Sequence, residues 1–222
     1  MLETEKNYQS LKEYVESISI PIFGVANIEK LSKKVEWIPE ATQGFKHAIS
    51  IAIPLSSTII DKIIDRPDRL YLHHYRTANM FLDQAGFKIT TFIQEQGHDA
   101  LPIPASIIID WRKQIGHLNH RVVAQEAGLG WIGKNRLLIH PKYRAKVRLV
   151  TILTNMPLVA NDEFIESKCE GCNKCMQACP VNAIKDKIVD FDIKACLTKL
   201  QDFSKSENLG HYICGLCIKA CK

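Results

Sequence analysis

The sequence predicts an α+β fold in which an α/β body precedes a small cysteine-rich module. Short, β-branched apolar runs alternate with longer stretches of helical periodicity in the first part of the chain. All eight cysteines, in contrast, come after residue 168. With 222 residues, 46% of them hydrophobic, the chain can bury a sizeable core and does not need the cysteines as covalent staples. We therefore expect a body over residues 1–165 and a metal-binding module over residues 166–222.

The elements of the body follow in order along the chain. Apolar residues at helical spacing predict helices over residues 4–18, 68–96 and 118–128, the second ending near Gly97 and the third at Gly128. Short apolar runs predict buried strands over residues 21–28 and 47–55, and "HDALPIP" predicts a further strand. The segments "RLLIH" and "KVRLVTILTN" predict a hairpin that turns across "PKYRA".

No stretch of the sequence approaches the length of a membrane span. The N-terminal segment is charged and lacks the apolar region of a signal peptide. We therefore expect a cytoplasmic protein without a membrane partner. In a reducing compartment, eight cysteines indicate metal ligands rather than disulfides.

The spacing of the first four cysteines is that of a bacterial ferredoxin. The run C-x2-C-x2-C-x3-C-P binds cubane clusters, and its fourth cysteine ligates the other cluster in two-cluster ferredoxins. The end of the chain repeats C-x2-C-x3-C, with its leading cysteine displaced upstream. Two zinc sites are the alternative, but zinc ligands usually come as two separated C-x2-C pairs. We predict two [4Fe–4S] clusters with crossed fourth ligands: Cys169, Cys172, Cys175 and Cys221 for the first, and Cys196, Cys214, Cys217 and Cys179 for the second.

The formal charge of +5 is a weak argument for nucleic-acid binding. Each cubane with its four thiolates carries roughly −2, so two clusters lower the balance to about +1. The densest basic run, "HPKYRAKVR", is either a solvated hairpin tip or a contact with an anionic ligand.

A glycine-rich stretch, "AGLGWIGKN", is the second dense motif. Gly128, Gly130 and Gly133 allow the backbone to approach another group closely. The motif follows a helix and precedes a strand, which is the reverse of the order in dinucleotide-binding folds. Trp131 within it either stacks on a ligand or belongs to the core.

Taken together, "AGLGWIGKNRLLIHPKY", the "LVTILTN" strand and the double-cluster module resemble epoxyqueuosine reductase. They are similar, more distantly, to the corrinoid reductive dehalogenases. The resemblance covers residues 100–222 well and the first hundred weakly. It implies a nitroreductase-like α/β body followed by a ferredoxin-like double-cluster module, with a base-off cobalamin that receives electrons from the near cluster. By this resemblance, the corrinoid would lie along Gly130, Ile132, Gly133, Lys134, Asn135, Leu138 and Pro141. FMN is an alternative, because nitroreductase-like bodies often hold a flavin.

Two departures from that family bear on the substrate. Epoxyqueuosine reductases carry an acid in an Asp-Thr-x-Pro stretch, 14 residues before the first glycine of this motif, and the same count here falls on Gln114, with Asp110 the nearest acid. The sequence also stops at Lys222, where those enzymes continue into a helical-repeat tail that helps to hold tRNA. Both departures argue against a tRNA substrate. His117 and His120 are candidates to replace the missing acid as proton donors, or are ordinary polar residues of a helix face.

These observations lead to two hypotheses of different classes. The first is an oxidoreductase that uses its clusters to reduce a bound corrinoid, and through it a small substrate. The second is an electron-transfer protein that activates the cofactor of a partner enzyme and has no substrate of its own. Both require a low-potential electron donor such as ferredoxin or flavodoxin.

Overall fold

The computed structural model describes residues 2–32, 43–110 and 116–222. The chain forms two compact units, each assembled from separate stretches of sequence. The first unit contains Met1–Ile53, Asn79–Leu129 and Arg148–Ile165, and the second contains Pro54–Ala78, Gly130–Val147 and Glu166–Lys222. Two stretches of the expected body thus group with the cysteine module. The expected assignment of metal binding to residues 166–222 alone stays a prediction.

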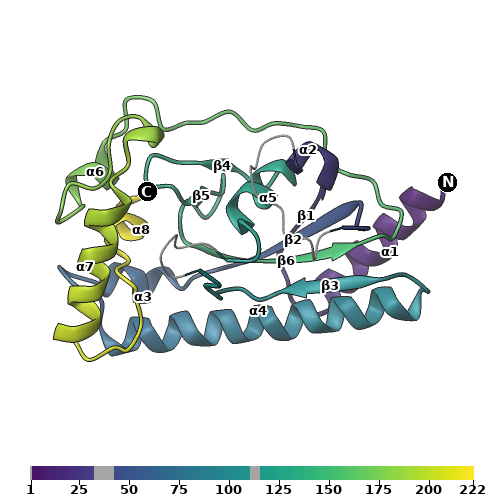
Figure 1. Cartoon of the computed structure of the whole chain (residues 1–222), viewed down its shortest axis with the longest axis horizontal. Helices are drawn as coiled ribbons and strands as arrows, with labels where there is room; N and C mark the ends of the chain where they lie inside the picture. The colour runs from purple at the N-terminus through teal and green to yellow at the C-terminus, as the bar shows by residue number, and fades with distance from the viewer. Residues whose placement is uncertain (1, 33–42, 111–115) are drawn as a thin grey trace. The chain divides into compact units, whose positions relative to one another are not determined.

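A four-stranded sheet in the order β1-β2-β6-β3 forms the centre of the first unit (Figure 1). The strands are β1 (Ile22–Asn27), β2 (His47–Pro54), β3 (Ala100–Ile103) and β6 (Val147–Thr154). β1 pairs with β2 in antiparallel register, and β3 pairs with β6 in the same sense. Five of the eight residues of β2 and seven of the eight residues of β6 are buried, as expected for central strands with both faces covered.

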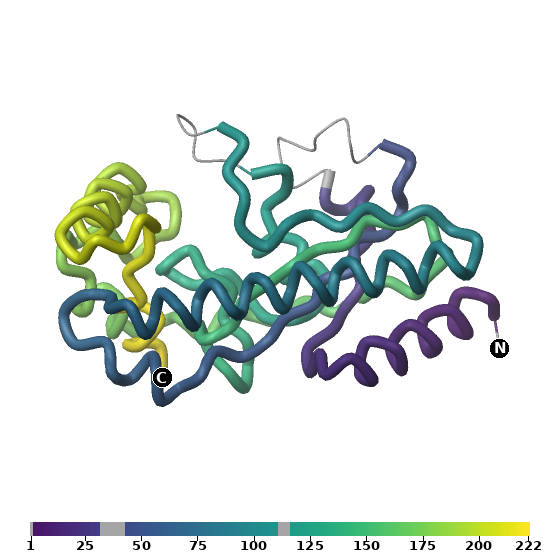
Figure 2. Tube along the Cα trace, turned by 90° about the horizontal axis from the view of Figure 1, so that it is seen from below, coloured from purple at the N-terminus to yellow at the C-terminus, as the bar shows by residue number. Residues whose placement is uncertain are grey.

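Helices cover both faces of this sheet. Figure 2 shows α1 (Glu3–Ser17) and the Asn79–Glu95 part of α4 (Arg69–Glu95) on the same face. The core between these helices and the sheet includes Leu11, Val15, Leu82, Ile89, Ile49 and Ile152. α5 (His120–Glu126) contacts β1 and also α2 (Ile28–Ser32). The predicted helices and strands of the body are confirmed in type and nearly in their bounds.

Glycine ends both α4 and α5, as the sequence predicts. Gly97 has φ 82° and Gly128 has φ 75°, values that favour glycine over residues with a Cβ. The amide of Gly128 donates to the carbonyl of Gln125, and that of Leu129 donates to Ala124 at 2.9 Å. These two hydrogen bonds form the Schellman motif, which satisfies the last carbonyl groups of a helix.

The second unit surrounds the cysteines with short elements. It contains α3 (Ser57–Lys62), the first part of α4, β4 (Trp131–Ile132), β5 (Leu138–Ile139), α6 (Lys174–Gln177), the 3₁₀ helix η2 (Ile188–Asp190), α7 (Ile193–Ser206) and α8 (Leu216–Ala220). Asp192 caps the N-terminus of α7, because its side chain accepts a hydrogen bond from the amide of Ala195 at 2.8 Å. α8 packs against α6 and α3.

The predicted hairpin between "RLLIH" and "KVRLVTILTN" is wrong. β5 pairs with β4, and β6 instead belongs to the four-stranded sheet of the first unit. The turn across "PKYRA" does form, because His140 and Arg144 exchange two backbone hydrogen bonds at 2.9 and 2.8 Å. Arg144 has a positive φ of 56°, and the strand that follows pairs within the four-stranded sheet instead.

Within the described residues, no helix combines the length and the apolar character that crossing a bilayer requires.

Candidate metal centre

The first cysteine run forms a tight loop that leads into a short helix. The amide of Cys172 donates to the carbonyl of Cys169 at 3.2 Å, and Gly171 between them has φ 69°. Cys175 lies on α6, and Cys179 follows the C-terminal end of that helix. Short spacings of this kind place several thiols around one centre, as a cubane cluster requires.

The thiols of the first predicted set lie within electrostatic reach of one another. The pKa of Cys175 is raised by burial and then by the neighbouring thiols of Cys221, Cys169 and Cys172. The pKa of Cys221 is likewise raised by burial, with further contributions from Cys169 and Cys172. Cys221 thus lies near Cys175, although the two are 46 positions apart in the sequence.

All four thiols of the second predicted set are partly buried, whereas Cys172 of the first is exposed. Burial raises the pKa of Cys214 to about 11, with contributions from Cys196 and Cys179. The pKa of Cys217 is raised by burial and then mainly by Cys214 and Cys196, and that of Cys196 by burial and Cys179. Cys179 is thus a charged neighbour of Cys196 and Cys214, and crossed ligation stays a prediction.

The chemistry of the donors fits two iron–sulfur clusters. A buried thiol with a raised pKa is costly to ionise alone, whereas a bound metal stabilises the thiolate directly. Among the described residues, no three His, Cys, Asp or Glu side chains converge closely enough to share one metal ion. A cubane instead takes its four thiolates at separate corners, so two sets of four spaced thiols suit it.

The three glycines of "AGLGWIGKN" pack against the protein itself. A Cβ on Gly130 would lie 2.2 Å from the carbonyl oxygen of Ile139, and one on Gly133 would lie 2.7 Å from the Ile139 side chain. A Cβ on Gly128 would lie 2.6 Å from the side-chain amide of Asn161. These contacts let β4 and β5 approach closely and explain the glycines without a ligand.

Lys134 contacts the cysteine loop rather than an open ligand site. Its Nζ donates to the carbonyl of Cys172 at 3.2 Å, to Oδ1 of Asn173 at 3.3 Å and to Oδ1 of Asp186 at 2.6 Å. Only 10% of the Lys134 side chain is exposed, compared with 77% of Asp186. The hydrogen bond to Asp186 raises the pKa of Lys134, and the thiols of Cys169 and Cys175 add to the effect.

The other residues expected along a corrinoid are mostly enclosed. Gly130, Gly133, Asn135 and Leu138 are buried. Oδ1 of Asn135 accepts a hydrogen bond from the amide of Leu137 at 3.1 Å, which closes a local turn. Ile132 is half-buried and Pro141 is exposed. The side chain of Asn135 therefore stabilises its own turn, and among the residues expected along a corrinoid Ile132 and Pro141 are the more accessible ones.

Trp131 has a role that the sequence did not predict. Its indole is 3% exposed, and Nε1 donates to Sγ of Cys169 at 3.3 Å. Trp131 and Lys134 thus both contact the first cysteine loop. Asn173 and Asp186, which hold Lys134, were also missed, because no motif marks a partner 39 or 52 residues away.

Both imidazole nitrogens of His120 are engaged within the body. Nδ1 lies 2.8 Å from Oγ1 of Thr151, and Nε2 lies 3.0 Å from the carbonyl of Pro104. Because a carbonyl only accepts, Nε2 carries the proton and Nδ1 accepts from the hydroxyl. Burial, with the charge of Arg148 next, lowers the pKa of His120 to about 4. A neutral imidazole with hydrogen bonds at both ring nitrogens is a poor proton donor, so the contacts favour a structural role for His120.

The position of His117, the second predicted proton donor, does not support a catalytic role. It lies in the partly buried segment before α5. Gln114, the position of the expected acid, lies outside the described residues. Asp110, the nearest acid, is half-buried.

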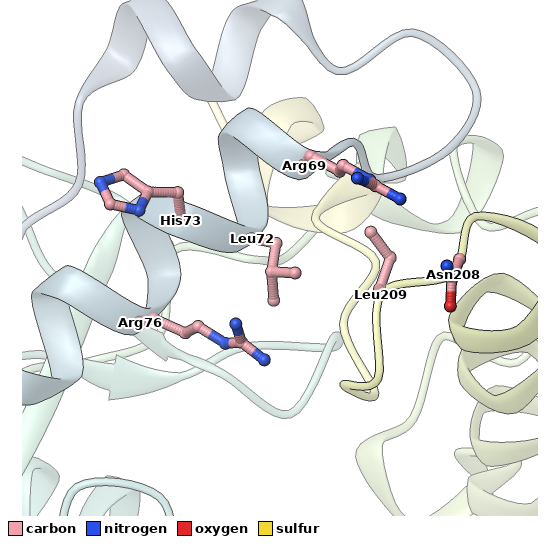
Figure 3. A pocket seen from close by; sticks show the side chains of 6 residues that line it. All are labelled: Arg69, Leu72, His73, Arg76, Asn208 and Leu209. Atoms are coloured by element: carbon pink, nitrogen blue, oxygen red, sulfur yellow. The ribbon is translucent and has the colours of Figure 1, made fainter.

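A pocket of about 310 Å³ opens on the second unit (Figure 3). Arg69, His73 and Arg76 line it from one face of α4, at spacings of four and three residues. Leu72 of the same helix and Leu209 supply its apolar lining, and Asn208 completes it. A guanidinium nitrogen of Arg76 lies 3.1 Å from Nδ1 of His211. The lining contains two arginines and no acid, which suits an anionic group.

Comparisons with known proteins agree with this site. Residues 163–185 match the family model described as 4Fe-4S binding domain. Epoxyqueuosine reductase from Bacillus cereus is 36% identical over 114 residues, which are 48% of this chain and 30% of that protein. The enzyme of the same name from Synechococcus sp. is 37% identical over 124 residues, 55% of this chain and 35% of that protein. The chain is similar to epoxyqueuosine reductase. The matched part spans about a third of the length of these curated relatives.

Solved structures show the same fold over nearly the whole chain. A structure of epoxyqueuosine reductase with a modified tRNA-Tyr stem loop has a TM-score of 0.63 at 20% identity, covering 96% of this chain and 64% of that one. A catabolic reductive dehalogenase in complex with 3-bromo-4-hydroxybenzoic acid has a TM-score of 0.78 at 17% identity, covering 98% of this chain and 32% of that one. The resemblance that the motifs suggested is therefore confirmed, and it now extends to the fold.

Proposed function

We propose that this protein is an iron–sulfur oxidoreductase whose two [4Fe–4S] clusters relay single electrons to a low-potential acceptor. The observation that carries the proposal is the proximity of thiols from distant parts of the sequence: Cys221 lies among the charged neighbours of Cys175, and Cys179 among those of Cys196. The 4Fe-4S family match over residues 163–185 supports it. When bound, the clusters supply one-electron chemistry. The chain would hold their thiolates, and it partly buries all four cysteines of the second set.

The acceptor we propose is a corrinoid bound to a nitroreductase-like body. One similar structure is described as suggesting a mechanism for B12-dependent dehalogenation, and it has a TM-score of 0.77 with this chain. The side chains of the glycine motif do not themselves fit the group well, because Lys134 and Asn135 are buried in other contacts. A corrinoid would have to rest on Ile132, Pro141 and exposed backbone. FMN remains the alternative acceptor.

A second candidate function is the reduction of epoxyqueuosine in tRNA. Curated relatives with 35–43% identity carry the name of that activity, which supports it more strongly than the sequence motifs alone did. The sequence argument against tRNA rested partly on Gln114, which lies outside the described residues. The electron-transfer hypothesis, in which a partner enzyme's cofactor is the acceptor, stays open beside it.

Anaerobic purification with metal analysis and an electron paramagnetic resonance (EPR) spectrum tests the proposal. We expect about eight iron atoms per chain and two reducible [4Fe–4S] signals. Zinc in place of iron would refute the clusters. Addition of cobalamin to the reduced protein then tests the acceptor: a base-off absorption band that remains through gel filtration supports the corrinoid.

The two candidate substrates require a separate assay. The loaded protein is incubated with dithionite, cobalamin and a tRNA stem loop that contains epoxyqueuosine, and the nucleosides are analysed by mass spectrometry. Conversion to queuosine supports the tRNA function. Full clusters without conversion favour another acceptor or a partner enzyme.

A further inference from the structure

Two buried side chains from the glycine motif meet the loop that holds the first cluster. Trp131 donates its indole N–H to Sγ of Cys169 at 3.3 Å. Lys134 donates to the carbonyl of Cys172 at 3.2 Å, and its position is fixed by Asp186 and Asn173. Both residues are less than 10% exposed, so their contacts with the loop are shielded from water.

Neither contact is explained by packing alone. A buried tryptophan needs a hydrogen-bond partner for its N–H, but a backbone carbonyl would satisfy it as well as a sulfur atom. A buried lysine is costly unless it is paired, and Asp186 pairs this one. The ammonium is also close enough to the thiols of Cys169 and Cys175 for their charge to act on it. The arrangement therefore brings one dipole and one positive charge to the same side of the first set.

The charge of a cluster changes when it takes up an electron. A cubane with four thiolates goes from roughly −2 to roughly −3, and hydrogen bonds to sulfur, nearby charge and solvent exposure set how favourable that step is. A donor N–H on a ligand sulfur and a cation beside the loop both stabilise the added negative charge. Burial strengthens both effects, because water does not screen them.

We propose that Trp131 and Lys134 are positioning residues that raise the reduction potential of the first cluster. Through these two residues the glycine motif influences electron transfer. This inference rests on the cluster occupancy proposed above. It assigns Trp131 and Lys134 of the "GWIGK" stretch to the cluster rather than to a corrinoid. The reductant is any low-potential one-electron donor, which transfers one electron to the oxidised cluster.

The test is an EPR-monitored redox titration of the anaerobic, loaded protein with dithionite and mediators. Wild type should show two one-electron transitions. In Lys134→Met, which keeps the length of the side chain but removes the charge, one transition should move to more negative potential. We expect at least a tenfold change in the equilibrium constant for reduction, which is 59 mV for a one-electron couple. Trp131→Phe, which removes only the N–H, should move the same transition in the same direction by less.

Two further variants separate charge from structure. Lys134→Arg keeps the positive charge and should keep the wild-type potential. Lys205→Met removes an exposed lysine from the end of α7 and should leave both transitions unchanged. Iron content is measured for every variant, so that a lost cluster is not mistaken for a shifted one.

Each outcome decides the matter. A shift of one transition in Lys134→Met and Trp131→Phe, with none in Lys134→Arg, supports the inference. Full clusters with unchanged potentials in both variants would overturn it while leaving the proposed function intact. If both variants lose iron while Lys134→Arg keeps it, the two residues are structural supports and the inference is wrong. Wild type without iron would remove the proposed function and this inference together.

Discussion

Replacing Gly130 with alanine tests whether the glycine motif serves packing or a ligand. The new Cβ would lie 2.2 Å from the carbonyl oxygen of Ile139 and 2.9 Å from its carbon. Both atoms belong to the backbone of the β4–β5 pair, so neither can move without breaking the pairing. The φ of 155° at this position adds strain for any residue with a side chain.

The two costs add to a substantial loss of stability. A sparsely populated backbone conformation costs about 1–3 kcal/mol. Forcing an extra carbon into a packed site typically costs another 1–3 kcal/mol. We therefore expect Gly130→Ala to destabilise the fold by roughly 2–6 kcal/mol, or about 4–24 °C in melting temperature for a chain of this size.

The assay compares melting temperatures of anaerobic, cluster-loaded protein by circular dichroism. Gly97→Ala is the matched control, because Gly97 also has a positive φ but no atom lies within 4 Å of its added Cβ. That variant should lose only about 1–2 kcal/mol. If Gly130→Ala melts like wild type and loses only the binding of cobalamin, the glycine faces a ligand and the packing explanation is refuted.

Three other predictions follow from the site. Cys179→Ala should reduce the EPR signal of the second cluster first; loss of the first cluster's signal instead would refute crossed ligation. His120 binds its proton more weakly folded than unfolded, so protonation of the unfolded chain costs stability as pH falls below about 6.5 toward 4. Between pH 7 and pH 5, the free energy of unfolding of His120→Gln, measured in urea, should therefore fall by about 1–2 kcal/mol less than that of wild type. An equal fall in both proteins would show that His120 does not titrate this way. The double variant Arg69→Glu/Arg76→Glu reverses the charge of the pocket. It should slow reduction of the clusters by an acidic flavodoxin and abolish the salt dependence of that rate, but leave reduction by dithionite unchanged. Wild-type rates with flavodoxin would exclude docking at that pocket.

Local signals predicted much of the fold. Helical periodicity identified α1 and α4, and Gly97 and Gly128 marked helix ends because a positive φ favours glycine. The hairpin failed for a physical reason. Strand partners are set by long-range packing, and β6 gains more by lying between β2 and β3 than by pairing with β5.

The candidate site divides along the same line. Cysteine spacing indicates a cluster because the ligands of one loop are local in sequence, and the crossed pair follows from the internal repeat. The fate of Lys134 could not be predicted in this way. Its partner Asp186 lies 52 residues away in a segment without a motif, so only the folded chain shows that the lysine faces the cysteine loop.

The unequal exposure of the two thiol sets determines where oxidation begins when the protein meets air. Cys172 is exposed, whereas the other seven cysteines, including all four of the second set, are partly buried, so oxidants reach the first set at Cys172 before they reach the second. The sets are interleaved, however, since Cys221 of the first follows Cys217 of the second on α8 and its end. Damage at the surface would loosen the segment that holds the sheltered centre. Shielding a single cysteine would then protect both.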